Sequence, residues 1–383
     1  MIRMNYISNL GLEKVTGGWS GVNYQLYHNF SSKFDVRFVG PVNPPVDKAE
    51  KILSKAGRVA GVKGNFYFFS DKRLKAISKQ VNGKCNPEAE LDFYLGSTSW
   101  LQCKSNRPYA CFLDASFPTY IGLYHNQDEF RKNDVERICR LERDWLNNAD
   151  MVFYSSTWTK KDALEKLNVA DDADKHIVVK LGGNINGSRE DSYHPEKDGI
   201  NLLFISFHFE KKGGMDCWKA FQLLKRDFPD AKLHLIGQKP PDKVMNTAGV
   251  VHHGVLDKAD PLQLKEYEEI LSKATFLIHP TRMDATPTVL IEAAYFGCPS
   301  VAPAVFGIPD LIGDKQTGVL LNEKFTAEDI AGVITGLLNK QDHYTAMRKA
   351  CRAYAMNELS WDAVTNKIYL KIREKLQVAA QQV

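Results

Sequence analysis

Short apolar runs alternate with helical patterns along the whole chain, and this alternation restricts the folds that the chain can adopt. Strands separated by helices pair in parallel, because each crossover helix returns the chain to the same edge of the sheet. In the first half, strands are expected at 2–8, 36–39, 93–95, 110–113, 151–154 and 177–180, with helices at 21–30, 129–147 and 157–167. A second series of strands is expected at 202–206, 232–237, 250–253, 276–279, 299–302 and 318–321. The pattern predicts an α/β protein whose parallel sheets carry helices on both faces.

The length of 383 residues indicates two domains, each large enough to bury its own core. The two series of strands predict two doubly wound, Rossmann-like domains that face each other across a cleft. A Gly182-Gly183-Asn184 turn and the polar stretch to residue 198 have the composition of a linker. We therefore expect an N-terminal domain over 1–190 and a C-terminal domain over 191–360, with a last helix over 361–383 packing back on the first.

The composition is that of a soluble globular protein, with 44% hydrophobic and 25% charged residues. No apolar run approaches the roughly 20 residues that span a bilayer, and the first residues are too polar for a secretory signal. The seven cysteines show no C-x-x-C spacing, which favours reduced thiols over disulfides or a metal site. We expect a cytoplasmic protein.

The segment 276–302 joins an apolar strand, a polar loop, a helix and a second strand. Thr286 is a good N-cap and Pro287 suits the first helical position. Gly297, followed by Pro299, ends the helix. The loop before this helix is therefore expected to lie at the carboxyl edge of a sheet.

The start of this helix has the properties of a phosphate seat. The amides of Thr288 and Val289 have no partner within the helix, and a helix N-terminus attracts anions. Glu292 lies one turn after Thr288 on the same face, and Asp284 lies on the loop eight positions before Glu292. One element thus offers a phosphate seat and two carboxylates, the groups that a nucleotide sugar requires.

Two glycine-rich turns each follow the first strand of a series. Gly17 and Gly18 open a helix, and their flexibility allows close backbone approach to a phosphate. Taken alone this signal is weak, because such glycines often serve helix–strand packing only. In the second series, Lys211 and Lys212 precede Gly213-Gly214 and could neutralise charge on a diphosphate. The alternative is a solvated charged turn.

Asp114 ends an apolar strand at an expected carboxyl edge. A carboxylate there lies more often in a cleft than in a core, because an unpaired buried charge is costly. A turn or N-cap role carries equal weight. His279 and His252-His253 also end strands, but they are too scattered for a metal site and are expected to be satisfied structural histidines. No metal site is expected.

The region from Lys48 to Lys84 contains ten Lys or Arg residues against two acidic ones, an excess of eight positive charges. It also includes the aromatic run 65–69 and an apolar stripe of Leu74, Ile77 and Val81. Such an element could rest on an anionic membrane or receive an acidic acceptor. We favour the alternative interpretation, in which the segment is a helix that faces the core and exposes its lysines to solvent. No nucleic-acid-binding module is present in the sequence.

In its ordered motifs the chain resembles the family 4 glycosyltransferases, which depend on nucleotide sugars, have the GT-B fold and retain anomeric configuration. The signature is an acidic-x7-Glu segment, here D-A-T-P-T-V-L-I-E at 284–292 followed by A-A-Y-F-G-C-P-S-V-A. The resemblance covers nearly the full chain. Further matches are K-K-G-G at 211–214, L-H-L-I-G ending at Gly237, H-H-G-V at 252–255, F-G-I-P-D at 306–310, and in the first half G-G-W-S-G, R-L-E-R-D-W-L-N-N-A-D-M-V-F-Y-S-S and V-V-K-L-G-G-N.

The resemblance implies a role for each matching residue. Lys212 would bind the donor diphosphate, together with the backbone amides of Thr288 and Val289. Glu292 would hold the ribose hydroxyls, and Asp284 would face the transferred sugar. The remaining residues implied at the donor are Gly17, Gly18, Lys211, Gly237 and Thr286, with Gly17 and Gly18 flanking either the diphosphate or the acceptor.

Three positions depart from the family pattern. The first acid is Asp284, one methylene shorter than the usual glutamate. Phe207 and His208 occupy the region of a common arginine, and Lys211 substitutes imperfectly because lysine makes no bidentate fork. Asp114 stands where a histidine is common. Lys212, Asp284 and Asp114 are the expected catalytic residues.

From the residues and the resemblance together we expect a retaining glycosyltransferase that moves a hexose, such as glucose, from a UDP-sugar to a sugar or lipid-linked saccharide acceptor. Its context would be polysaccharide or glycoconjugate synthesis, and no cofactor beyond the nucleotide sugar is expected. Two alternatives stay open: a GT-B sugar-nucleotide epimerase, and a non-catalytic nucleotide-sugar-binding protein.

Overall fold

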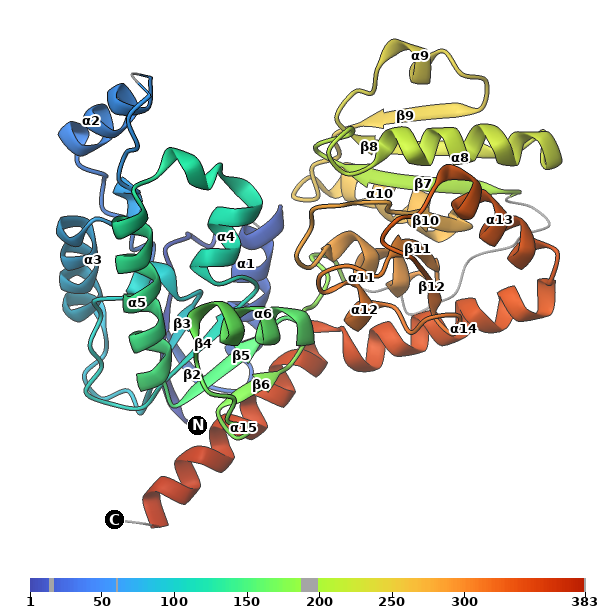
Figure 1. The fold of residues 1–383 in the computed structure, drawn as a ribbon. Coiled ribbons are helices and arrows are strands. Elements are labelled where there is room, and N and C mark those ends of the chain that lie inside the picture. The colour runs from blue at the N-terminus through green and yellow to red at the C-terminus, as the bar shows by residue number, and fades with distance from the viewer. Residues whose placement is uncertain (14–16, 60, 187–198, 382–383) are drawn as a thin grey trace. The chain divides into compact units, whose positions relative to one another are not determined.

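The computed structural model describes residues 1–383 apart from 14–16, 60, 187–198 and 382–383, and the chain divides into two compact units (Figure 1). Unit 1 comprises Met1–Lys14, Asn23–Lys180 and Thr365–Val383, and unit 2 comprises Val15–Val22 and Leu181–Val364. The expected boundary at residue 190 falls outside the described residues. The glycine-rich turn at Gly17 and Gly18 groups with unit 2, although it was expected in the first domain.

Unit 1 is built on a six-stranded parallel sheet in the order β2-β1-β3-β4-β5-β6. All six predicted strands are present, with ends shifted by up to two residues. The last strand ends early because Lys180, which was expected within it, has a positive φ of 70°. The strands are β1 Arg3–Ile7, β2 Asp35–Val39, β3 Leu91–Leu95, β4 Tyr109–Leu113, β5 Met151–Tyr154 and β6 His176–Val178.

Helices cover both faces of this sheet. The central strands β3, β4 and β5 are therefore buried along their whole length. Residues of α3, α4, α5 and α6 pack on one face. On the other, Phe30 of α1 packs edge-on against Phe93, and Tyr369 of α15 packs against Phe34 at 5.2 Å. The helices are α1 Gly18–Phe30, α2 Lys48–Val59, α3 Asp71–Lys84, α4 Phe117–Tyr124, α5 Lys132–Asn148, α6 Thr157–Leu167 and α15 Trp361–Gln381, with 3-10 turns η1 Tyr67–Phe69, η2 Thr98–Trp100 and η3 Gln127–Glu129.

A buried carboxylate fixes the loops at the carboxyl ends of β3 and β4. Glu142 of α5 is fully buried and accepts hydrogen bonds from Ser97 Oγ at 2.5 Å, Thr98 Oγ1 at 2.9 Å and the Phe117 amide at 2.7 Å. Burial raises the pKa of Glu142, although these three donors oppose the shift. The loop that carries Asp114 is therefore held at both ends, by β4 and by Glu142.

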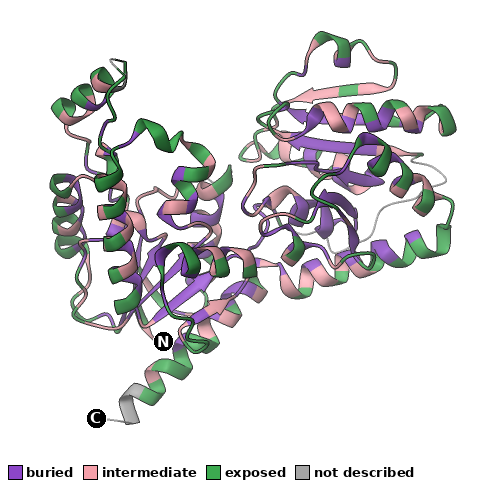
Figure 2. Cartoon of the chain, in the orientation of Figure 1, coloured by how far each residue is buried: buried purple, intermediate pink, exposed green. Residues whose placement is uncertain are grey.

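The basic region divides into two helices of opposite character (Figure 2). Leu74, Ile77 and Val81 of α3 are at most 2% exposed, so the predicted apolar stripe faces the core and the favoured interpretation of this stripe is confirmed. Helix α2, in contrast, leaves apolar side chains exposed. Within the described residues, no helix has both the length and the apolar character needed to cross a bilayer.

Unit 2 is built on a second six-stranded parallel sheet, in the order β12-β11-β10-β7-β8-β9. The predicted architecture of two doubly wound parallel sheets is thus confirmed. The strands are β7 Asn201–Ser206, β8 Lys232–Gly237, β9 Val250–Gly254, β10 Phe276–Ile278, β11 Ser300–Pro303 and β12 Gly318–Leu321. The helices are α8 Gly214–Asp227, α9 Asp242–Met245, α10 Pro261–Lys273, α11 Thr288–Tyr295, α12 Ile308–Leu311, α13 Ala327–Leu338 and α14 Gln341–Glu358.

Candidate functional site

The strand order of unit 2 reverses direction between β7 and β10. From β7 the chain proceeds outward to β8 and β9, whereas from β10 it proceeds the other way to β11 and β12. The loops that leave two such strands diverge, and the crevice between them is where open α/β sheets bind ligands. The two loops here are 207–213 and 279–287, and they carry four of the predicted site residues, Lys211, Lys212, Asp284 and Thr286.

Lys212 and Asp284 meet across these two loops. Lys212 Nζ lies 2.7 Å from Asp284 Oδ2 and donates to the Met283 carbonyl at 2.5 Å. A glycine makes the approach feasible: Gly213 has a φ of +82°, and a Cβ at this position would lie 2.1 Å from the Pro280 carbonyl oxygen. Both side chains are about one-fifth exposed, at 19% and 21%, so the pair is accessible from solvent.

His279 is a second neighbour of the Asp284 carboxylate. Its Nε2 lies 3.5 Å from Asp284 Oδ2, in ion-pair contact without hydrogen-bond geometry. The imidazole is 2% exposed, and neither ring nitrogen has a hydrogen-bond partner among the described residues. The expectation of a satisfied structural histidine is therefore wrong for His279, because its strand ends one residue earlier and turns the ring toward the acidic loop.

Burial by itself raises the pKa of the Asp284 carboxyl, but His279 and Lys212 more than offset burial, and the net pKa is below the ordinary 3.8. Since the folded pKa is lower than the unfolded one, the carboxylate stabilises the fold above the ordinary value. That contribution disappears as the pH falls through the folded pKa.

We expect the free energy of unfolding of Asp284→Asn, relative to the wild type, to show a deficit near neutral pH. The deficit should shrink as the pH falls below about 4. Urea unfolding at several pH values measures it. A deficit that stays constant down to about pH 3 would contradict an ion-paired carboxylate.

Glu292 is fully buried on the first turns of α11 and is enclosed by protein donors. Its Oε2 accepts from Lys258 Nζ at 2.6 Å and from the Tyr267 hydroxyl at 2.5 Å. Its Oε1 accepts from the backbone amide of Asn184 at 3.1 Å. Burial, and then the neighbouring carboxylate, raise the pKa of Tyr267, so its hydroxyl stays protonated and donates. A ribose hydroxyl would have to replace one of these donors, and Lys258, which is 16% exposed, is the most accessible.

The sequence analysis did not identify Asn184, Lys258 and Tyr267 as partners of Glu292. Asn184 also donates from Nδ2 to the Gly18 carbonyl at 3.3 Å, which links the glycine-rich turn to Glu292 within unit 2. The glycines of the segment Gly182-Gly183-Asn184 were a sequence signal for close packing against Glu292 and its neighbours. A Cβ on Gly183 would lie 3.1 Å from Glu292 Cγ and 2.8 Å from the Tyr295 ring.

Helix α11 begins one residue later than predicted. It starts at Thr288, and Pro287 is the N-cap residue, with no side-chain capping bond, so the prediction of Thr286 as N-cap is wrong. Pro287 has an extended ψ of 108°, which keeps it outside the helix. The predicted end is confirmed, because Gly297 has a φ of +66° and its amide bonds to the Ala294 carbonyl.

The other predicted residues lie at the following places. Gly237 ends β8 with a φ of +121°, and a Cβ there would lie 1.9 Å from the Ser206 carbonyl oxygen at the end of β7. Lys211 is exposed. Gly17 has a φ of +93° in the turn before α1. Asp114, which follows β4, is partly buried and belongs to unit 1, so it is described apart from these residues.

Comparison with known proteins adds a family to this geometry. Residues 188–355 match the family described as "Glycosyl transferases group 1". The matched residues lie within unit 2. The predicted resemblance to glycosyltransferases of this type is confirmed, whereas the retention of anomeric configuration stays a prediction.

Proteins similar in sequence to this chain include two bacterial glycosyltransferases. The D-inositol 3-phosphate glycosyltransferase of Corynebacterium aurimucosum is 25% identical over 64% of this chain and 62% of its own length. The lipopolysaccharide glucosyltransferase WaaG of Escherichia coli is 27% identical over 46% of this chain and 48% of its own length. The chain thus spans less than two thirds of either relative.

A solved structure similar over nearly the whole chain is that of Anabaena Alr3699/HepE in complex with UDP-glucose. It has a TM-score of 0.64 at 15% identity and covers 98% of this chain and 100% of its own. At this identity the similarity shows the fold alone. The predicted GT-B fold is therefore confirmed.

Proposed function

We propose that the protein is a retaining glycosyltransferase that moves a hexose, such as glucose, from a UDP-sugar to a sugar or lipid-linked saccharide acceptor. The observation that carries this proposal is the Lys212–Asp284 pair, which lies at the switch point of the unit 2 sheet on loops beside the start of α11. A cation and free helix amides are suited to a diphosphate, and a carboxylate is suited to sugar hydroxyls.

In the proposed reaction, the bond between the sugar C1 and the diphosphate oxygen breaks, and a bond from C1 to the acceptor oxygen forms. The proton of the acceptor hydroxyl passes to the departing diphosphate oxygen. Lys212 and the amides of Thr288 and Val289 stabilise the charge that develops on the leaving group, which is an electrostatic form of catalysis. Asp284 then exchanges its contact with Lys212 for contacts to the transferred sugar.

The names of the relatives support the substrate classes in this proposal. WaaG is named as a glucosyltransferase of lipopolysaccharide, and Alr3699/HepE was solved with UDP-glucose. Glucose, UDP and a lipid-linked acceptor in polysaccharide or glycoconjugate synthesis are therefore proposed together. Glu292 is assigned to the ribose, and Gly237 to the neighbourhood of the base. Lys211, Gly17, Gly18 and Thr286 are placed around the donor, and Asp114 is a candidate catalytic residue.

The proposal assigns no metal and no further cofactor. It places the protein in the cytoplasm, at the inner face of the membrane through peripheral contact of the region Lys48–Lys84. The excess of positive charge in that region suits an anionic lipid surface.

A thermal-shift screen against UDP, GDP, ADP and their glucose, galactose, mannose and N-acetylglucosamine conjugates tests the donor. We expect the largest shift with UDP-glucose, because at equal concentrations the ligand that binds most tightly stabilises the folded state most. A ligand at about 100 times its Kd stabilises it by about 2.7 kcal/mol. Transfer of labelled glucose to a saccharide acceptor should follow. Conversion of UDP-glucose to another UDP-sugar without acceptor would instead indicate an epimerase, and a larger shift with GDP or ADP would contradict the UDP assignment.

A further inference from the structure

Helix α2 turns its apolar face to solvent. Ile52 is 65% exposed, Leu53 72% and Val59 91%, whereas Ser54 on the opposite side is buried. Residues 49, 52, 53, 56 and 59 follow helical spacing and are all apolar and exposed. Apolar helix faces are normally buried in the core of a globular domain. A contiguous apolar face that is exposed instead indicates a site of interaction with a partner or a membrane.

The inward contacts of α2 are polar and specific. Ser54 Oγ donates to the Asn65 carbonyl at 2.9 Å, and Asp47, which precedes the helix, pairs with Lys72 of α3 at 2.5 Å. Gly64 allows this close packing, since a Cβ there would lie 2.4 Å from Ser54 Oγ. The helix is thus attached by its polar side, which fixes the apolar side outward.

Lysines border the exposed face. Lys48 and Lys55 are exposed on α2, and Lys63, which follows the helix, is 56% exposed. The one acidic residue of α2, Glu50, is half-buried on the inward side. An apolar stripe bordered by lysines complements an anionic lipid surface, in which acyl chains lie beneath negatively charged head groups.

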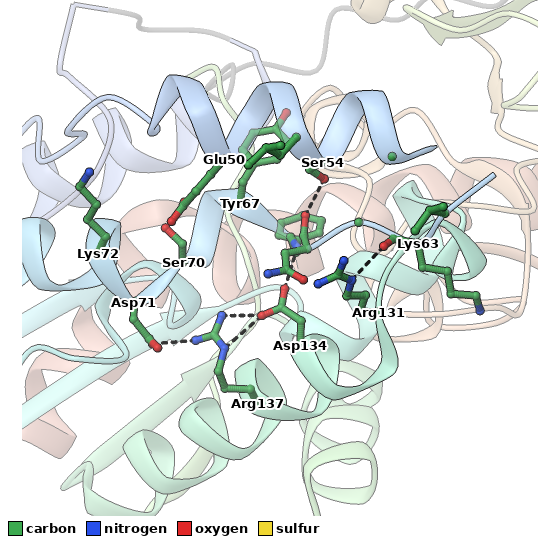
Figure 3. A pocket seen from close by; sticks show the side chains of 16 residues that line it. Glu50, Ser54, Lys63, Tyr67, Ser70, Asp71, Lys72, Arg131, Asp134 and Arg137 are labelled. Carbon is green, nitrogen blue, oxygen red and sulfur yellow. Dashed lines mark hydrogen bonds and ion pairs between the residues drawn. The ribbon is translucent and has the colours of Figure 1, made fainter. Parts of the chain in front are cut away.

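A pocket of about 490 Å³ opens beside this face (Figure 3). Leu53 and Val62, both exposed apolar residues, contribute to its lining. Figure 3 shows Arg131 beside Lys63, where Arg131 Nε donates to the Lys63 carbonyl at 3.0 Å. The lining also includes the carboxylates of Asp71 and Asp134, which both pair with Arg137, and that of Glu50. The guanidinium of Arg131 beside the apolar rim suits a lipid whose phosphate contacts it and whose chains lie outside the pocket.

The pocket also holds polar groups that the protein does not satisfy. Glu50 Oε2 and Ser70 Oγ line it, and neither atom has a hydrogen-bond partner among the described residues. Buried acceptors and hydroxyls require partners.

We propose that unit 1 docks on an anionic phospholipid bilayer through α2, with its apolar face in the interface and a glycerophosphate head group in the adjacent pocket. This refines the membrane contact of the proposed function, since α3 buries its apolar stripe in the core whereas α2 exposes its apolar face. Docking is independent of the transfer chemistry in unit 2, so the two proposals can fail separately.

Co-sedimentation of the full chain with phosphatidylglycerol-containing vesicles tests the docking. Ile52→Asp/Val59→Asp should lower the partition coefficient by at least about tenfold, because two apolar side chains no longer enter the interface. Leu262→Asp is the matched control, since Leu262 is 80% exposed on α10 of unit 2 and should bind as the wild type does. Transfer to a soluble acceptor should be unchanged in both variants, which separates loss of docking from loss of activity.

Two further variants test the charges. Lys48→Gln/Lys55→Gln should weaken binding to anionic vesicles on the order of 20-fold and leave binding to phosphatidylcholine unchanged. Arg131→Gln should reduce the preference for phosphatidylglycerol over phosphatidylcholine, and a wild-type preference would overturn the head-group seat. Absence of co-sedimentation at low salt would overturn the docking, as would a dimer by light scattering that dissociates in Ile52→Asp/Val59→Asp, because a second copy would then cover α2.

Discussion

Lys212→Ala should lower the turnover of glycosyl transfer by about 10²–10³-fold while the protein remains folded. The ammonium group is the cation closest to Asp284, at 2.7 Å, and the proposed leaving group develops its charge at this position. Because the side chain is partly exposed, its removal leaves no large cavity. Steady-state kinetics with UDP-glucose and circular dichroism measure the two effects.

Lys219→Ala is the control for Lys212→Ala, because Lys219 is an exposed lysine on α8 in the same unit. It should retain wild-type turnover. Lys212→Met, which keeps the length of the side chain without its charge, should be as inactive as Lys212→Ala. Near-normal turnover in Lys212→Met would rule out an electrostatic role for this residue.

Glu292→Gln should destabilise unit 2 by about 3 kcal/mol, which is the lower end of the range for breaking a buried ion pair, because Lys258 keeps some contact with solvent. Glutamine has the size of glutamate, but three donors converge on the two carboxylate oxygens and the amide nitrogen of glutamine accepts from none of them. The variant should also lose affinity for UDP. Urea unfolding and calorimetry measure these changes.

A double-mutant cycle isolates the charge pair within this cluster. Lys258→Met leaves the carboxylate with its two other donors, and the double variant Glu292→Gln/Lys258→Met should recover part of the lost stability, since no buried charge is then unpaired. Strictly additive losses would show that the 2.6 Å contact contributes no coupling.

The alternation of apolar runs predicted both sheets, because a strand that is buried on both faces consists of contiguous apolar residues. Strands such as β5 and β8 have the predicted bounds, since their apolar residues are contiguous and turn residues flank them. The start of α11 was predicted less well. Cap preferences favoured Thr286, but the backbone of Pro287 decides where the helix begins.

The candidate site was predictable where motif residues share loops, and not where partners come from distant segments. Lys212 and Asp284 were assigned to one site from the sequence, and the structure places them in contact. The donors to Glu292 are separated from it by 25, 34 and 108 positions, and no local pattern encodes such contacts. Similarly, the outward apolar face of α2 reverses the usual rule that apolar helix faces point to the core.

The composition of unit 2 has a consequence for how the chain can be divided. The unit takes Val15–Val22 from near the N-terminus, and α15 begins in unit 2 and continues in unit 1 from Thr365. A fragment that starts at residue 188, where the family match begins, would lose Asn184, whose backbone amide donates to Glu292. It would also lose the Gly18 carbonyl, which accepts from the Asn184 side chain. Unit 2 is thus not separable at residue 188, and gene fusion or exchange at that boundary would transfer an incomplete folding unit.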